Sequence, residues 1–239
     1  MQCNDELAGL HININKTKGM RVNTSNMQKF RPEETEIEEV GSFVYLGSVM
    51  SESGGTEEDV ASKIKKANGV FVQLYPVWRN LNISKEVKLR IFNTIVTSVL
   101  LYACETWKTI NQITRKLQIF VNKCLRRIMN IKWTNKIMDE ELWRITHWKS
   151  IDNQIKRRKW KWIGHTLRKE TGAIKKTALD WNPQGYRRRG RPKRMWRRTI
   201  EDEIRSTRRS WNEVKDITED RNAWKLYMDA LCSTRSKRI

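Results

Sequence analysis

The spacing of apolar positions along the chain becomes helical after Thr56. From there, apolar side chains recur every third or fourth residue, at Val60, Ile64, Ala67, Phe71 and Leu74. This spacing places them on one face of a helix, and the acidic residues 57–59 favour a helix start at this point. Pro76 predicts the end of the helix, because proline has no amide hydrogen to continue the ladder.

Two further helices follow in the middle of the chain. Ser84 is a good N-cap for a helix over about 85–104. Its residues 91–104 carry no charge, so we expect this helix to be buried on most sides and to occupy the centre of the fold. A third helix is predicted over about 113–128, with a basic outer face. That face carries Arg115, Lys116, Lys123, Arg126 and Arg127.

The C-terminal part also has helical periodicity. A short helical piece is expected around 140–145, and Ser150 caps a helix that runs to about residue 169. A loop over 181–191 then leads to Pro192, which suits the first position of a helix. Residues 210–213 (Ser-Trp-Asn-Glu) form a capping box. A last short helix brings Trp224, Met228 and Leu231 together, and the tail from 233 onward is expected to fray.

The N-terminal 50 residues have the period of a strand instead. Ile12 and Ile14, and later Met20 and Val22, alternate with polar residues around a predicted turn at 16–19. Residues 31–39 are acidic and predict a loop. Residues 43–48 (Phe-Val-Tyr-Leu-Gly-Ser) are rich in β-branched and aromatic side chains and predict a hairpin. The expected fold is therefore mainly α, with a small N-terminal β-hairpin.

Charge is distributed unevenly along the 239 residues. The net charge is +21, and residues 1–60 carry 5 basic against 11 acidic side chains. Residues 151–239 carry 26 basic against 11 acidic ones. A basic field that grows toward the C-terminus favours nucleic acid as the partner, ahead of an anionic membrane surface or an acidic protein.

The sequence does not predict secretion or membrane insertion. The N-terminus has no basic stretch before an apolar run, and the longest uncharged run, 91–104, is too short to cross a bilayer. We therefore expect an intracellular protein, with the nucleus as one location. The four cysteines, Cys3, Cys104, Cys124 and Cys232, are widely scattered, so we expect free buried thiols.

Neither a metal site nor a nucleophilic site is predicted. Cys104, Cys124, His147 and His165 are separated by 19, 22 and 17 residues, whereas structural zinc sites contain ligand pairs separated by only a few residues. No Ser or Cys has a recognisable activating neighbour. We expect no metal, no cofactor and no catalytic residue in this chain.

The most basic segment is 185–198, which holds seven arginines and one lysine but no acidic residue. Such a segment has too little apolar surface to fold on itself, so it predicts contact with a polyanion. A nuclear-localisation-like patch and a solvated loop are the alternatives. The predicted contact residues are Arg187, Arg188, Arg189, Arg191, Lys193, Arg194, Arg197 and Arg198.

A second basic and aromatic stretch lies on the helix that Ser150 caps. Residues 156–162 read Lys-Arg-Arg-Lys-Trp-Lys-Trp. Trp160 has the spacing of a core residue together with Ile163 and Leu167. We predict that Arg157, Arg158 and Lys161 contact phosphates and that Trp162 stacks on bases. The alternative is that these charges only face water.

The order of motifs resembles the C-terminal part of reverse transcriptases from non-LTR (LINE-type) retrotransposons, and RTE-like elements most of all. Residues 9–13 and 16–18 resemble the fourth palm motif, and residues 43–48 resemble the primer-grip hairpin that follows it. Residues 98–107 resemble a thumb helix and its exit. Three further segments resemble the region after the thumb: residues 158–165, 181–185 and 188–193.

The resemblance implies roles for five N-terminal residues. Lys16 and Lys18 match the palm motif, whose lysine assists departure of pyrophosphate in the family, although a solvated turn is the alternative here. Tyr45, Leu46 and Gly47 match the primer grip, where glycine lets a nucleic-acid strand approach the backbone. The family's polymerase site uses an Asp-Asp turn to hold two Mg²⁺ ions, and this chain contains no Asp-Asp pair.

These observations predict three regions. Residues 1–50 would be a palm remnant with the hairpin, 56–150 a thumb-like helical bundle, and 151–239 a basic helical extension. The expected function is binding of RNA, RNA–DNA or DNA duplex without sequence preference, in a fragment of an RNA-directed DNA polymerase. Two alternatives stay open: part of an active reverse transcriptase whose palm and endonuclease are encoded outside this chain, and a translated remnant with no selected activity.

Overall fold

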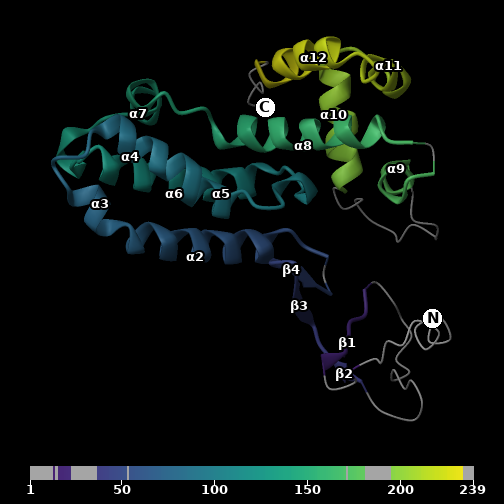
Figure 1. Cartoon of the computed structure of the whole chain (residues 1–239), viewed down its shortest axis with the longest axis horizontal. Coiled ribbons are helices and arrows are strands. Elements are labelled where there is room, and N and C mark those ends of the chain that lie inside the picture. The colour runs from purple at the N-terminus through teal and green to yellow at the C-terminus, as the bar shows by residue number, and fades with distance from the viewer. Residues whose placement is uncertain are drawn as a thin grey trace. The chain divides into compact units, whose positions relative to one another are not determined.

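The computed structural model describes residues 13, 16–22, 37–52, 54–170, 172–180 and 195–233. Of the described residues, 66% are helical, and a small hairpin lies near the N-terminus, so the expected mainly-α fold class is confirmed (Figure 1). It divides into two compact units, residues 1–62 and 63–239. The three regions predicted from the sequence, 1–50, 56–150 and 151–239, stay a prediction.

The first unit contains two small pairs of strands. β1 (Lys18–Gly19) pairs in parallel with β2 (Glu38–Glu39). The expectation of a loop through residue 39 was therefore wrong at its end, because Glu38 and Glu39 bond to the backbone of β1. β3 (Ser42–Tyr45) and β4 (Ser48–Ser51) form the predicted antiparallel hairpin. The predicted strand residues Ile12 and Ile14 lie outside the described residues.

A two-residue turn joins the strands of the hairpin. Tyr45 pairs with Ser48, which leaves Leu46 and Gly47 as the central turn residues, with φ of 47° and 80°. Positive φ at both positions is what a type I′ turn requires, and glycine accepts it without strain. The Val49 amide donates to the Asp59 carboxylate at 2.9 Å. This bond ties the hairpin to the first turn of α2 (Glu57–Gln73).

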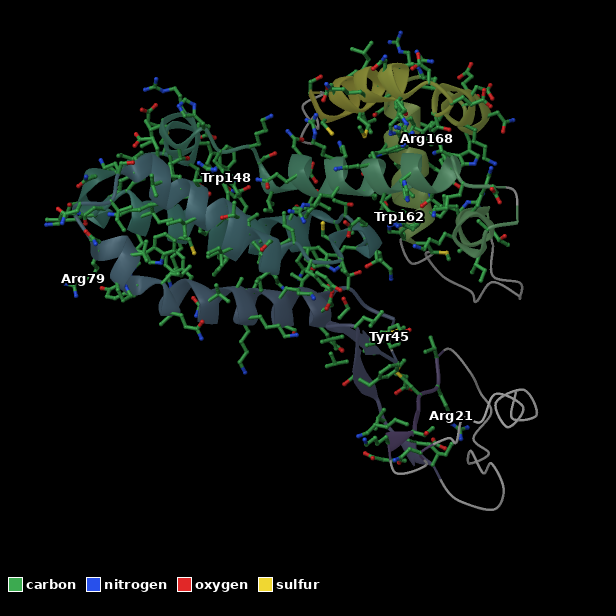
Figure 2. All side chains as sticks on the ribbon, viewed as in Figure 1. Arg21, Tyr45, Arg79, Trp148, Trp162 and Arg168 are labelled. Atoms are coloured by element: carbon green, nitrogen blue, oxygen red, sulfur yellow. The ribbon has the colours of Figure 1, made fainter. Side chains whose placement is uncertain are left out.

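The helical unit begins within α2, and aromatic residues fill the core that follows. As predicted, α2 ends before Pro76, which lies in the first turn of α3 (Tyr75–Arg79). Phe71 stacks on Trp78 with ring centroids 5.2 Å apart, and its carbonyl accepts the Trp78 indole N–H. Phe92 packs on Phe71 and, 5.6 Å away, on Trp148, which is labelled in Figure 2.

The helix predicted over 85–104 is shorter and less regular than expected. Ser84 caps α4 (Lys85–Ile91), which continues through a π-helical turn (Phe92–Val96) into α5 (Thr97–Leu100). Ala103 then has φ of 59° and leads into a 3₁₀ turn, Cys104–Thr106. One face is fully buried, but Ile95 and Tyr102 are 42% and 52% exposed. Burial on most sides was thus wrong, because core elements cover only one face.

A polar network joins the next helices. These are α6 (Asn111–Ile128) and α7 (Asp139–Thr146), with a 3₁₀ turn (Trp133–Asn135) before α7. The buried Asn122 side-chain oxygen accepts from Gln118 at 2.8 Å and from the Trp143 indole at 2.9 Å. The oxygen of Gln118 accepts the backbone N–H of Ile151, at the start of the next helix, at 2.9 Å.

Five helices make the C-terminal part. They are α8 (Ile151–Leu167), α9 (Ile174–Asp180), α10 (Trp196–Ser206), α11 (Trp211–Ile217) and α12 (Arg221–Ser233). The caps at Ser150 and Ser210 are confirmed, the second as a full capping box. Helix α9 was not predicted, and Pro192 lies outside the described residues. In Figure 1, α10 crosses α8, and α12 lies over the same region.

The core of this part is built around Trp160. Trp160, Ile163 and Leu167 are buried together with Ile200, Ile204 and Trp224, which confirms Trp160 as a core residue. A β-carbon on Gly164 would lie only 2.2 Å from the Trp224 indole nitrogen. Glycine is therefore required at 164 for α12 to approach α8 this closely.

Candidate nucleic-acid interface

The predicted contact residues of the helical unit that the structure describes lie on α8 and at the start of α10. A buried ion pair holds these two helices together: the Lys159 ammonium, which is fully buried, lies 2.7 Å from the Glu203 carboxylate. Lys159 also donates to the Thr109 hydroxyl at 3.0 Å, and Glu203 accepts the Trp160 indole N–H at 2.5 Å. Every hydrogen-bonding group at this contact therefore has a partner, as burial requires.

Lys161 and Arg198 are the most available predicted contacts. Both side chains are exposed, and within the described part of the chain neither has a hydrogen-bond or ion-pair partner. Arg197 pairs with Glu201 one turn later at 3.4 Å, an exposed contact. Such surface pairs contribute little free energy, so Arg197 can exchange Glu201 for a phosphate at small cost.

Arg157 and Arg158 are already engaged within the fold. Arg157 forms an ion pair with the Asp229 carboxylate of α12, and both side chains are about half exposed. The half-buried Arg158 donates to the backbone carbonyl of Leu101 at 3.3 Å. A phosphate would have to compete with Asp229 for Arg157.

Trp162 is part of an aromatic pair. Its ring meets the ring of Trp196 edge-on, with centroids 6.1 Å apart. The Trp196 indole donates to the Glu105 carbonyl at 2.7 Å, so this pair also fixes the start of α10. Trp162 is only half-buried, so part of its side chain stays accessible to a base. Figure 2 shows Trp162 beside the junction of α8 and α10.

Six of the predicted contacts lie outside the described residues: Arg187, Arg188, Arg189, Arg191, Lys193 and Arg194. The elements on either side of them are described. Leu179 of α9 and Ile200 of α10 both belong to the core around Trp160. The arginine-rich segment, residues 185–198, therefore follows one helix that is packed on α8 and leads into another.

The predicted contacts of the first unit have different surroundings. Lys18 lies 3.2 Å from the Glu38 carboxylate, with both side chains exposed. The backbone N–H of Lys16 donates to the Asn13 side chain at 3.2 Å, as in a turn. Tyr45 and Leu46 at the hairpin tip are 59% and 73% exposed, and Gly47 completes the turn between them and β4. The tip therefore presents an aromatic side chain to solvent.

Sequence reasoning missed the burial of Lys156 and Lys159. Both belong to the basic run on α8, for which the sequence suggested either phosphate contacts or charges facing water, yet they are 9% and 0% exposed. Lys159 is four residues from both Ile155 and Ile163, and this core spacing was the available signal. The sequence did not identify Glu203 as its partner, since the two residues are distant along the chain.

A polar cleft opens at the end of α8. Its volume is about 980 Å³, and its lining mixes basic and acidic side chains from α8, α9, α11 and α12, among them Arg168, Lys169, Lys176 and Glu219. Arg168 donates to the Thr218 carbonyl at 3.3 Å. The mixed charge gives the cleft no strong preference for an anion.

Cys104, Cys124 and Cys232 are free and buried, as expected. Burial raises the pKa of the Cys104 and Cys124 thiols to about 12. Among the described residues, no three His, Cys, Asp or Glu side chains are grouped so that they could hold a metal ion. None of the described helices is long and apolar enough to cross a bilayer.

The sequence of this chain is similar to that of a protein described as transposon-derived. The chain is 24% identical over 229 residues to F52C9.6 of Caenorhabditis elegans, whose name describes it as uncharacterized and of presumed transposon origin. The match covers 90% of this chain and 81% of the relative. A family model described as a domain of unknown function (DUF6451) matches residues 70–102, from the last turn of α2 to just past α5. No solved structure matches the chain.

Proposed function

We propose that this chain derives from the reverse transcriptase of a non-LTR, RTE-like retrotransposon. We further propose that it binds RNA, RNA–DNA or DNA duplex through phosphates, without sequence preference. The ordered motifs from residue 9 to residue 193 support the origin, and so does the similarity to a transposon-derived protein over 90% of the chain. The excess of basic residues supports the binding.

The observation that carries the proposal is the anchoring of α9 and α10. Both helices pack against α8 in one core, and the arginine-rich segment joins them. Lys161 on α8 and Arg198 on α10 are exposed, and neither has a partner among the described residues. Cations held on a folded body release condensed counterions from a nucleic acid when they contact its phosphates, and this release favours binding. Stacking of a base on the accessible part of the Trp162 ring adds a smaller contribution.

Polymerisation is not part of the proposal for these residues alone. Phosphoryl transfer by two metal ions requires closely spaced carboxylates, and the 239 residues contain no Asp-Asp pair. A polymerase that includes this chain would need those carboxylates from outside it. An upstream reading frame that encodes an Asp-Asp turn would favour that alternative.

A salt titration tests the proposed binding. The purified chain is titrated with a fluorescent RNA, an RNA–DNA hybrid and a DNA duplex at several salt concentrations. We expect log K to fall linearly with log salt, with a slope of about −0.9 for each duplex phosphate contacted. Replacing Arg187, Arg188, Arg189 and Arg191 by Ala should make the slope shallower by up to about 3.6. A flat plot for the unmodified chain would contradict the proposal and favour a remnant without selected activity.

A further inference from the structure

Helix α6 has a charge composition unlike that of the other long helices. Its 18 residues, Asn111–Ile128, include five basic side chains and no acidic one. Its apolar face is buried, from Ile113 through Leu117 and Leu125 to Ile128. The basic residues lie on the opposite side, with the 59%-exposed Ile119 among them. This row was not among the binding residues predicted from the sequence.

Four of these five cations have no acidic partner among the described residues. Arg126 is the exception, because it pairs with Asp139 at 2.8 Å and donates to the Ile137 carbonyl. In the described ranges, no carboxylate forms an ion pair with any of the remaining four. They are Arg115, Lys116, Lys123 and Arg127, and all four are exposed.

The row ends at a tyrosine flanked by two arginines. The Arg127 guanidinium lies 4.7 Å from the centre of the Tyr75 ring, and the Arg79 guanidinium lies 5.3 Å from it. Arg79 comes from α3, which packs on α6. A hydrogen bond from Arg127 and the charges of Arg79 and Arg127 hold the pKa of Tyr75 below its ordinary value. Two guanidinium groups are thus held on one ring without a carboxylate between them.

This arrangement is electrostatically unfavourable in the isolated protein and favourable against a polyanion. Like charges spaced one helical turn apart destabilise a helix. From Arg115 to Arg127 the helix rises by about 18 Å. A duplex presents roughly ten phosphate charges over that length. Guanidinium groups also match phosphate geometry, since they offer planar pairs of donors.

We propose that α6 and Arg79 form a second phosphate-binding surface. It would contact the backbone of a nucleic acid separately from the predicted contact residues on α8 and α10. The proposal rests on the proposed nucleic-acid function. Figure 2 shows Arg79 at one end of the helical unit and Trp162 at the other. A long duplex or a folded RNA can therefore be held at two places on the same unit.

The chemistry of the surface favours nucleic acid over other polyanions. Protein interfaces are built around an apolar centre, whereas α6 itself presents Ile119 as its one exposed large apolar side chain among these cations. Binding to a bilayer surface needs an apolar face turned toward the lipid, and the apolar face of α6 is buried in the core.

The test compares two variants of the full chain with equal charge. The first carries Arg115→Gln, Lys116→Gln, Lys123→Gln and Arg127→Gln. The control carries Lys65→Gln, Lys85→Gln, Lys149→Gln and Lys225→Gln, four exposed lysines on α2, α4, the loop before α8 and α12. Circular dichroism first establishes that both variants keep the helical content of the unmodified chain. Each is then titrated with a DNA duplex over a range of salt concentrations.

We expect the α6 variant to have a salt slope shallower by about 3 than the unmodified chain, and the control variant to differ much less. Bound duplex should also protect Lys116 and Lys123, but not Lys65, from acylation. Equal slopes in the two variants, or binding by α6 to anionic vesicles and not to duplex, would overturn the inference. If the unmodified chain itself shows no salt-dependent binding, the proposed function fails first. If the unmodified chain binds duplex but the two variants have equal salt slopes, the proposed α6 surface is wrong and the proposed function still stands.

Discussion

The ammonium of Lys159 on α8 lies 2.7 Å from the carboxylate of Glu203 on α10, and the lysine side chain is fully buried. The pair fixes the helix that follows the arginine-rich segment. We expect Glu203→Ala to lower the free energy of unfolding by about 3 kcal/mol, because it leaves a buried charge without a partner. Urea unfolding followed by circular dichroism measures this change.

Glu201→Ala is the matched control for Glu203→Ala. Glu201 lies on the same helix and pairs with Arg197, but both side chains are largely exposed. Its loss should change stability by less than about 1 kcal/mol. Equal effects of the two substitutions would mean that the buried pair does not hold α10 in place.

Gly164 allows α12 to pack against α8. We expect Gly164→Ala to destabilise the protein by about 1–3 kcal/mol, because the added methyl group would overlap the Trp224 indole. Thermal unfolding measures the loss.

Gly69→Ala is the opposite case. This glycine lies on α2, and a β-carbon there would meet nothing within 4 Å. The substitution should stabilise the helix by about 0.5–1 kcal/mol. If both glycine substitutions shifted the midpoint in the same direction, the close contact with Trp224 would be refuted.

Lys161 and Arg157 lie one turn apart on α8 but differ in pairing. Lys161→Gln should make the salt slope of duplex binding shallower by about 0.9 and change stability by less than about 0.5 kcal/mol. Arg157→Gln should change the slope less, because Asp229 already partly neutralises this arginine. Parallel titrations of the two variants measure the difference. An equal change in slope would show that Arg157 leaves Asp229 on binding.

The buried thiols predict a loss of stability at high pH. Burial raises the pKa of Cys104 and Cys124 from the ordinary value of 9.0 to about 12. Above about pH 9 the unfolded chain releases thiol protons that the folded chain keeps. The free energy of unfolding should therefore fall between pH 9 and 12, by up to about 1.4 kcal/mol per pH unit for each thiol.

Unfolding at a series of pH values measures this dependence. The variant with Cys104→Ala and Cys124→Ala should be less stable at pH 8 but should lose less stability between pH 9 and 11. A parallel loss in both proteins would assign the pH dependence to other groups. In addition, a thiol reagent should label these two cysteines only after denaturant is added, as mass spectrometry of the labelled peptides can determine.

Local chemistry made much of the fold predictable. Ser84, Ser150 and Ser210 cap helices as expected, because a serine hydroxyl satisfies an amide that the helix leaves open. The hairpin around Leu46 and Gly47 was predictable for a similar reason, since its turn needs positive φ. These features depend on neighbours in the sequence.

The candidate interface was only partly predictable. Charge density identified the basic stretches, and helical periodicity placed Trp160 in the core. Neither shows that Arg157 meets Asp229, that Trp162 meets Trp196, or that Arg79 and Arg127 share the ring of Tyr75. These partners lie on other elements, so their proximity depends on how the helices pack.

The sequence by itself determined the mainly-α class, the helix starts at Ser84, Ser150 and Ser210, the hairpin and the excess of positive charge, because each depends on short-range spacing or composition. The tertiary structure alone decided which cations are buried, which are paired and which are left for a partner. Lys159 and Lys161 show the difference: they are two residues apart in one basic run, yet one is enclosed with Glu203 and the other faces solvent. The reason is physical, since a charge is stabilised by the groups that surround it, and packing brings those groups from distant parts of the chain.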